Sequence, residues 1–273
     1  SNQTFKGAYS VSLMYSGHEG DHTTSFFSSD IYTDRLDKPF IELGSVEKDL
    51  ADTEAQLHVT ELSGKFEGSI ILTPSSLGSF LGSIISNFAA DGVILEKTSI
   101  WLEKLGQQVA DSRISISICP EDSRIVGGEH YTADGFRSES FDLIRNGVLE
   151  SFFLSLYVSN KSGFPRAKST SFSVVIEGGD TSYEDIIKNT KKGLIVGRFS
   201  GGQPGTNGDF SGVAKNSFLV EDGQIKGAVS ETMINGNLAE LLNNLNSISR
   251  ETVEDGYSVL PYMAFDKVVI SGK

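Results

Sequence analysis

The chain is poor in the residues that hold metals or form disulfides. It has one cysteine and four histidines among 273 residues. The single Cys119 cannot form an internal disulfide, which is typical of proteins in a reducing cytoplasm, and four histidines leave few ways to bind zinc. No apolar run approaches the roughly 18 residues that a membrane-spanning helix needs. We therefore expect a cytoplasmic protein with no membrane span.

Basic residues are scarce as well. The 23 lysines and arginines against 36 acidic residues give a net charge of −13. A surface of this sign repels nucleic-acid phosphates and anionic lipids, so we expect no direct nucleic-acid partner and no membrane partner. The 29 glycines beside six prolines indicate many tight turns between short strands in a globular chain.

The N-terminal part of the chain has the pattern of a strand hairpin followed by a helix. Residues 8–15 alternate apolar and polar side chains, and residues 23–33 resume a strand pattern after a polar turn. Residues 45–57 place apolar side chains at helical spacing among charged ones, with Ser45 as the predicted N-cap. The glycine-containing stretch 60–65 is the first predicted boundary.

The next segment predicts a strand that leads into an amphipathic helix. Residues 66–72 predict a buried strand, and Pro74 opens the helix because proline suits the first helical turn. Isoleucines alternate with polar residues over 114–118, which predicts a further strand. Apolar side chains at helical spacing predict that one face of the helix points to the core: Leu77, Phe80, Leu81, Ile84, Ile85 and Phe88.

The C-terminal half is dominated by predicted hairpins. The pairs Asn146-Gly147 and Asp222-Gly223 supply the positive φ angles of type I′ turns. The hairpin strands are predicted over 141–145 with 148–156 and over 217–221 with 224–229. Helices are predicted over 183–192 and 238–248, and strands over 193–199 and 267–270. Helices separated by antiparallel hairpins favour an α+β fold with largely antiparallel sheets and a few packed helices.

One short motif matches a zinc-protease signature. His18, Glu19 and His22 fit the pattern H-E-x-x-H. The pattern binds zinc on a helix, where residues four apart face the same side. Here the motif lies between two strand patterns, and Gly17 and Gly20 oppose a helix. We interpret it as an exposed polar hairpin loop.

A second segment, residues 193–208, has the glycine content of a phosphate-binding loop. It lacks the G-K-[ST] ending, and no helix pattern begins where an anion would need N–H donors. Ser200 has no G-x-S-x-G context and no obvious histidine base, which argues against a nucleophile. We interpret the segment as an exposed loop that lines a groove, with these candidate residues: Arg198, Ser200, Gly201, Gly202 and Gly205.

Six sequence blocks share their order and spacing with a known family. They are Asp134-Gly-Phe-Arg137, Asp142-Leu-Ile-Arg-Asn-Gly-Val-Leu149, Gly193-Leu-Ile-Val196, Gly208-Asp-Phe-Ser-Gly212, Phe218-Leu-Val-Glu-Asp-Gly223 and Val229-Ser-Glu-Thr-Met-Ile-Asn-Gly-Asn-Leu238. The chain resembles the TldD/PmbA family, long called modulator of DNA gyrase and related to peptidases. The resemblance implies that residues 63–273 are the family's C-terminal domain and residues 1–62 a remnant of its middle region. One departure is Ser171, where the family usually has glycine.

The resemblance also bears on metal binding. In the TldD branch, a helix carries the zinc motif H-E-x-x-x-H, and the resemblance places Gly82, Ser83 and Asn87 at its three functional positions. None of these residues replaces an imidazole ligand, and Ser83 cannot act as a carboxylate base. The chain is therefore similar to the PmbA branch, also called TldE, and we expect no metal ligand, no catalytic residue and no cofactor in it.

The resemblance implies a subunit role. We expect a non-catalytic subunit of a peptidase complex that binds an extended peptide and a zinc-bearing TldD-like subunit, or that pairs with itself as a dimer. Two alternatives stay open. One is a self-sufficient metallopeptidase that uses His18 and His22 or an unrecognised site, and the other is a homodimeric peptide-binding scaffold.

Overall fold

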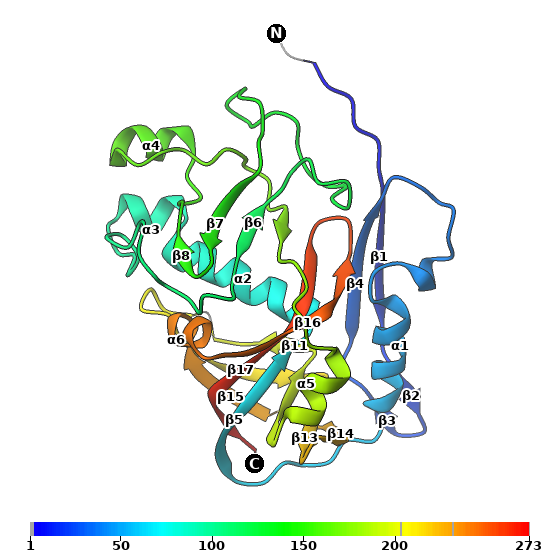
Figure 1. The fold of residues 1–273 in the computed structure, drawn as a ribbon. Helices are drawn as coiled ribbons and strands as arrows, with labels where there is room; N and C mark the ends of the chain where they lie inside the picture. The colour runs from blue at the N-terminus through cyan, green and yellow to red at the C-terminus, as the bar shows by residue number, and fades with distance from the viewer. Residues whose placement is uncertain (1–2, 203, 231, 273) are drawn as a thin grey trace.

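The computed structural model describes residues 3–202, 204–230 and 232–272 (Figure 1). The strands are β1 Tyr9–Tyr15, β2 His18–Glu19, β3 His22–Thr23, β4 Phe27–Thr33, β5 Lys65–Leu72, β6 Ile116–Ile118, β7 Phe141–Arg145, β8 Val148–Leu149, β9 Val174–Val175, β10 Lys192–Val196, β11 Arg198–Ser200, β12 Asp209–Lys215, β13 Ser217–Glu221, β14 Gln224–Val229, β15 Thr232–Asn237, β16 Leu245–Glu254 and β17 Val259–Ser271. The helices are α1 Val46–Ala55, α2 Pro74–Phe88, α3 Asp91–Leu95, α4 Leu156–Ser162, α5 Tyr183–Asn189 and α6 Leu238–Asn243, with a 3-10 turn at Phe40–Glu42.

Among the described residues, thirteen strands join in one large sheet. Its main path runs β14-β13-β10-β5-β17-β9-β6-β7-β8, and β11, β12, β15 and β16 are attached beside it. The pairs β10 with β5 and β17 with β9 are parallel, whereas the other neighbours are antiparallel. This largely antiparallel sheet with a few packed helices confirms the predicted α+β class.

Strand β5 lies inside this sheet and contributes to two apolar layers. Ile70 and Leu72 join the large core that includes the buried face of α2, whereas Ile71 joins a smaller core with Ile186 of α5. Because alternate side chains of a strand point to opposite faces, both faces of β5 are covered by apolar packing. Its three consecutive apolar residues therefore follow from burial on both sides, as predicted.

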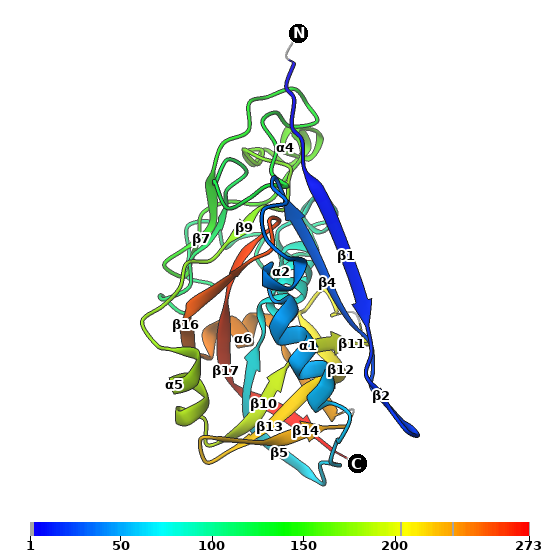
Figure 2. The same cartoon turned by 90° about the vertical axis from the view of Figure 1, so that its right-hand side faces the viewer.

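Residues 9–33, with strands β1 to β4, form an N-terminal ribbon. This ribbon and α1 lie along the side of the large sheet (Figure 2). Strands β1 and β4 pair antiparallel, which confirms the predicted hairpin, and the short strands β2 and β3 form its tip. Backbone hydrogen bonds attach this part to later segments: Tyr32 N–H donates to the Asp255 carbonyl in the turn after β16 at 2.7 Å, and Thr60 N–H donates to the Ala228 carbonyl of β14 at 2.9 Å.

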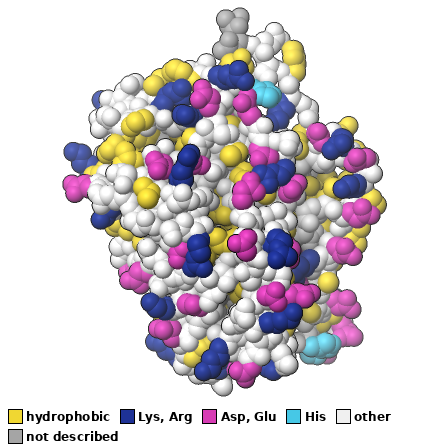
Figure 3. All heavy atoms as spheres, viewed as in Figure 1, with side chains coloured by type: hydrophobic (Ala, Val, Ile, Leu, Met, Phe, Trp, Pro, Cys, Tyr) yellow, Lys and Arg dark blue, Asp and Glu magenta, His cyan; other side chains and the backbone are white. Residues whose placement is uncertain are grey.

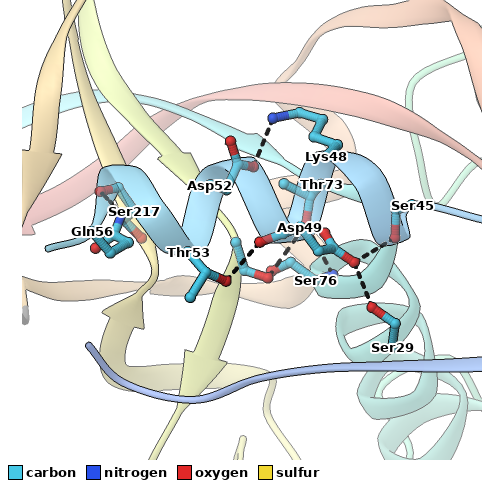
Figure 4. Close-up of polar contacts among 11 residues, drawn as sticks. Ser29, Ser45, Lys48, Asp49, Asp52, Thr53, Gln56, Thr73, Ser76 and Ser217 are labelled. Carbon is cyan, nitrogen blue, oxygen red and sulfur yellow. Dashed lines mark hydrogen bonds and ion pairs between the residues drawn. The ribbon is translucent and has the colours of Figure 1, made fainter. Parts of the chain in front are cut away.

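A half-buried carboxylate joins the ribbon to α1 (Figure 4). The Asp49 carboxylate accepts hydrogen bonds from Ser29 Oγ at 2.8 Å and Ser45 Oγ at 2.7 Å. Ser45 stands at the predicted N-cap position, but its hydroxyl donates to Asp49 instead of accepting a backbone N–H. At the other end of α1, Gln56 Nε2 donates to the Ser217 carbonyl at 3.0 Å. The helix is thus attached at one end to the ribbon and at the other to the sheet.

The two predicted type I′ turns have the expected backbone. Asn146 and Gly147 have φ angles of 49° and 79°, and Asp222 and Gly223 have 49° and 75°. The strand after Gly147 is shorter than the predicted 148–156, because β8 ends at Leu149 and α4 begins at Leu156. The second hairpin, β13 with β14, has the predicted bounds.

Two predictions near the C terminus are wrong. The helix predicted over 238–248 ends at Asn243, and residues 245–254 form β16, which pairs with β17. The last strand extends over residues 259–271 instead of 267–270. β16 pairs with the following strand β17, and β17 also pairs with the distant β5, so strand pairing overrides the local pattern in both cases.

Candidate functional site

Helix α2 positions the residues that the resemblance assigns to a zinc motif. Pro74 occupies the first turn, and the Thr73 side chain caps the helix by accepting a hydrogen bond from Ser76 N–H at 3.3 Å. All six predicted apolar positions are buried, with Leu81 only 1% exposed. The opposite face of the helix is polar and partly exposed. The local sequence therefore fixes which side chains reach the surface beside the glycine-rich loop.

The three zinc-motif positions lie away from the buried face of α2 and are half-buried. Ser83 Oγ donates a hydrogen bond to the Ser79 carbonyl at 3.1 Å, and Asn87 Nδ2 donates to the Ser83 carbonyl at 2.9 Å. Gly82 has no side chain, and the space where a Cβ would stand has no atom within 4 Å. The donor groups at 83 and 87 are thus used within their own helix.

A pocket of about 390 Å³ lies between α2 and the loop that follows β11. It brings Ser83 together with three residues of the candidate groove loop, Ser200, Gly201 and Gly202, although they are far apart in the sequence. The remaining lining residues are Ser79, Phe80, Phe199, Pro204, Phe210 and Leu238. Gln203, inside this loop, lies outside the described residues. The pocket is the meeting point of the two sets of predicted site residues.

Arg198 and Gly205 lie outside the pocket lining. The Arg198 guanidinium stacks over the Phe26 ring at 4.1 Å from its centroid. Gly205 belongs to a turn in which its N–H donates to the Asp209 carbonyl at 3.0 Å, and its own carbonyl accepts from Gly208 N–H at 2.8 Å. Arg198 therefore contacts the N-terminal ribbon, and Gly205 shapes the loop beside the pocket.

The glycines of the loop pack against a neighbouring strand. A Cβ on Gly202 would overlap with the Ser211 carbonyl of β12, so only glycine fits there. Gly201 has a φ of +98°, a conformation that side chains rarely adopt. Close approach to the backbone of β12 therefore explains Gly202, and the positive φ explains Gly201.

Aromatic residues at the floor of the pocket were not predicted as a group. The spacing of α2 predicts Phe80 only as a core residue, while Phe199 lies in β11 and Phe210 in β12, two strands that pair with each other. The alternating pattern of each strand could indicate a buried face. It does not reveal that the three rings converge.

The described residues around α2 do not suit a zinc ion. The described pocket lining contains no histidine, cysteine, aspartate or glutamate, and the two polar side chains at the motif positions bond to α2 itself. Within residues 3–202, 204–230 and 232–272, no three His, Cys, Asp or Glu side chains are grouped to hold a metal. Since zinc in proteins is bound mainly by these side chains, the site does not fit the ion.

The H-E-x-x-H letters form a hairpin in the structure. His18 pairs with Thr23 across the ribbon, and Glu19 pairs with His22. Because neighbouring residues of a strand alternate faces, this register puts His18 and His22 on opposite faces of the ribbon. The two imidazoles do not have the shared face that a helical zinc motif provides, and the loop prediction is confirmed.

Charge and membrane features complete the surface description. On the face in Figure 3, acidic and basic side chains of the described residues are interspersed.

None of the helices in the described part of the chain is long and apolar enough to span a membrane. Burial raises the pKa of the half-buried Cys119 thiol, which therefore favours its protonated form.

Comparison with known proteins identifies the family. Residues 63–272 match the model of the PmbA/TldA metallopeptidase C-terminal domain, and the chain belongs to the PmbA/TldD family. "Metalloprotease PmbA" of Escherichia coli O157:H7 is 30% identical over 185 residues, which is 64% of this chain and 40% of that protein. A "Metalloprotease" of Methanothermobacter thermautotrophicus is 27% identical over 201 residues, or 69% of this chain and 44% of that protein. The chain thus spans less than half the length of these curated relatives.

Solved structures share the fold. TldE from Thermococcus kodakarensis superposes with a TM-score of 0.83 at 23% identity, covering 97% of this chain and 63% of that one. A Bacteroides thetaiotaomicron protein described as a candidate modulator of DNA gyrase gives a TM-score of 0.83 at 25% identity, covering 97% and 60%. The similarity includes the N-terminal ribbon as well as the family domain.

Proposed function

We propose that this chain is the non-catalytic, PmbA/TldE-type subunit of a cytoplasmic TldD/PmbA peptidase complex. In this role it binds an extended peptide while a zinc-bearing TldD-like subunit supplies the catalytic metal. The observation that carries the proposal is the chemistry of the pocket beside α2. It has the size of a ligand site, yet Gly82, Ser83 and Asn87 offer no strong zinc ligand.

The strand next to the pocket supports peptide binding. β11 is three residues long and has a single strand neighbour, β12, among the described residues. An open strand edge can pair with an extended peptide through backbone hydrogen bonds, while neighbouring pockets receive alternate side chains. Ser200 ends β11 and lines the pocket, which joins the two features. On this proposal residues 63–273 form the peptide-binding domain and residues 1–62 the remnant of a preceding region.

The charge supports the same assignment. A net charge of −13 disfavours direct contact with DNA. A link to DNA gyrase, as in the description of one structural neighbour, then arises indirectly through the peptides that the complex removes.

Reconstitution tests the proposal. Purified chain is mixed with a zinc-bearing TldD-like protein, and cleavage of an unfolded peptide is followed by mass spectrometry. We expect a heteromeric complex in size-exclusion chromatography and faster cleavage by the mixture than by either protein alone. The matched control is the same mixture with a partner whose zinc ligands are replaced, in which cleavage should cease. Cleavage by this chain alone would contradict the non-catalytic role.

The names of the relatives favour a second candidate, a self-sufficient metallopeptidase. It requires stoichiometric zinc and peptidase activity in the isolated chain. A third outcome, a stable homodimer that binds peptides but never a TldD-like protein, would instead identify a peptide-binding scaffold. Size-exclusion chromatography of the mixture separates this outcome from the proposed complex.

A further inference from the structure

The floor of the pocket beside α2 is a cluster of three phenylalanine rings. The ring centroids of Phe80 and Phe199 lie 5.2 Å apart, those of Phe80 and Phe210 lie 5.4 Å apart, and those of Phe199 and Phe210 lie 5.8 Å apart. The interplanar angles of 58°, 86° and 89° are those of tilted and edge-to-face contacts. Such contacts hold the rings in fixed positions and give the pocket a defined apolar floor.

Two glycines make room for these rings. A Cβ on Gly212 would overlap with the Phe199 ring, and a Cβ on Gly236 would stand 2.9 Å from the Phe210 ring. Gly212 belongs to β12 and Gly236 to β15. Each of these strands therefore has no side chain at the position where an aromatic ring packs. The position of the rings therefore depends on glycines of two adjacent strands.

The pocket lining carries no charge among the described residues. Its polar side chains are the hydroxyls of Ser79, Ser83 and Ser200, and the first two donate to carbonyls of α2. A charged side chain that entered would lose its water without gaining a counter-ion, and even an uncharged polar side chain would lose hydrogen bonds to water, so both are disfavoured there. An apolar side chain meets no such penalty and gains contact with the rings.

From these observations we propose that the pocket is a subsite for one uncharged apolar side chain, aromatic or aliphatic, of an extended peptide. The inference rests on the proposed peptide-binding function and adds the class of side chain that the site selects. The peptide backbone pairs with the edge of β11, and the side chain that faces α2 enters between Ser83 and Ser200 onto the ring of Phe199. Phe199 is the most exposed of the three rings, since Phe80 and Phe210 are each only 3% exposed.

A set of matched peptides tests the preference. Fluorescent glycine- and serine-based heptapeptides that differ only at the central residue, Phe, Leu, Ala, Lys or Asp, are titrated with the full chain and with its complex with a TldD-like subunit. Anisotropy should show the Phe and Leu peptides binding at least about tenfold tighter than the Lys and Asp peptides, a ratio equal to about 1.4 kcal/mol. Equal affinity for all five would overturn the subsite while leaving peptide binding intact. No binding to either preparation would overturn the proposed function and the subsite together.

A blocking variant locates the effect. Ser83→Trp fills the mouth of the pocket, and its matched control is Ser86→Trp, an exposed position of α2 outside the lining. We expect Ser83→Trp to abolish the preference for Phe over Asp and Ser86→Trp to keep it. Ser79→Trp gives a second block at an exposed lining position if Ser83→Trp fails to fold by circular dichroism. A preference that survives in a folded blocking variant would contradict the proposed location.

Discussion

The Arg198 guanidinium lies over the Phe26 ring, 4.1 Å from its centroid, and thereby joins the strand beside the pocket to the N-terminal ribbon. A second contact supports the same junction, because Asn216 Nδ2 donates a hydrogen bond to the Phe26 carbonyl at 3.2 Å. Arg198, which is predicted to line a groove, thus connects β11 to a part of the chain outside the matched family domain.

We expect Arg198→Ala to loosen this junction. A cation over an exposed aromatic ring contributes about 0.5–1 kcal/mol, so global stability should fall only slightly. Hydrogen exchange should nevertheless rise in β4 and around Phe26. The control is Arg166→Ala, which removes a comparable stack over Phe136 (3.8 Å) between two residues outside the ribbon and should leave exchange in β4 unchanged. Equal exchange in both variants would show that the stack does not hold the ribbon.

Leu81→Ala tests the packing of α2. Leu81 is 1% exposed within the main core, and deletion of a buried leucine side chain costs about 2–5 kcal/mol. Denaturant unfolding should show this loss in the free energy of unfolding. Ser83→Ala, which removes a hydroxyl bonded only to its own helix, should change it by less than about 0.5 kcal/mol. Similar losses in the two variants would contradict the assignment of the buried face.

Gly147→Val tests the first hairpin turn. Gly147 has a φ of +79°, and a Cβ there would overlap with the Ala110 carbonyl. Gly163 has a similar φ of +81° but open space around its Cβ position, so Gly163→Val isolates the cost of the backbone angle. We expect the Gly147 variant to have the lower melting temperature. Equal melting temperatures would mean that close packing at this turn adds nothing.

The Glu129 carboxylate gives the fold a predictable response to acid. It accepts hydrogen bonds from Ser138 Oγ, Ser169 Oγ, Thr170 N–H and Thr170 Oγ1 at 2.6–2.9 Å. Burial by itself raises the pKa of Glu129, but these hydrogen bonds outweigh it, and the pKa is lowered from its ordinary value of 4.5. A carboxyl group with a lowered folded-state pKa stabilises the fold above its unfolded pKa and loses this contribution as the pH falls through the folded pKa.

Glu129→Gln should therefore unfold more easily at neutral pH, by about 1–3 kcal/mol, and should lose less further stability below pH 4.5 than the unmodified chain. Denaturant unfolding at a series of pH values measures both effects. Glu96→Gln, at an exposed position, is the control and should follow the unmodified chain. Parallel pH profiles for the Glu129 variant and the unmodified chain would contradict this role.

The same network accommodates the side chain of Ser171. Its φ is not positive, and its hydroxyl shares a hydrogen bond with Ser173 Oγ at 2.6 Å. Its N–H donates to Ser169 Oγ at 3.2 Å. A serine side chain thus fits this turn and extends the line of hydroxyls that leads to Glu129.

Local patterns predict much of this fold because they reflect local causes. The buried apolar face of α2 follows from the spacing of its side chains. The two type I′ turns follow from residues that tolerate positive φ angles. The end of α6 could not be predicted in this way, because Leu241, Leu242 and Leu245 continue a helical spacing into β16. Pro261 likewise disguises the long strand β17, since proline normally argues against a strand interior.

The candidate site likewise depends partly on local patterns and partly on contacts between distant segments. The family resemblance assigns Ser83 to a zinc-motif position without a zinc ligand, and the glycine-rich segment indicates a groove at Ser200. Their meeting in one pocket depends on where β11 lies relative to α2, which is set by pairing with β12 and by packing of Phe199 on Phe80. Contacts of this kind join distant segments and leave no periodic signal in either one.

Zinc content of the isolated chain tests the central claim most directly. The purified chain and a zinc-bearing TldD-like protein are incubated with zinc, desalted and measured by inductively coupled plasma mass spectrometry. We predict a stoichiometric metal in the TldD-like protein and far less than one ion per molecule of this chain, with no peptidase activity. Tightly held, stoichiometric zinc that supports peptide cleavage and is lost in His18→Ala or His22→Ala would contradict the account.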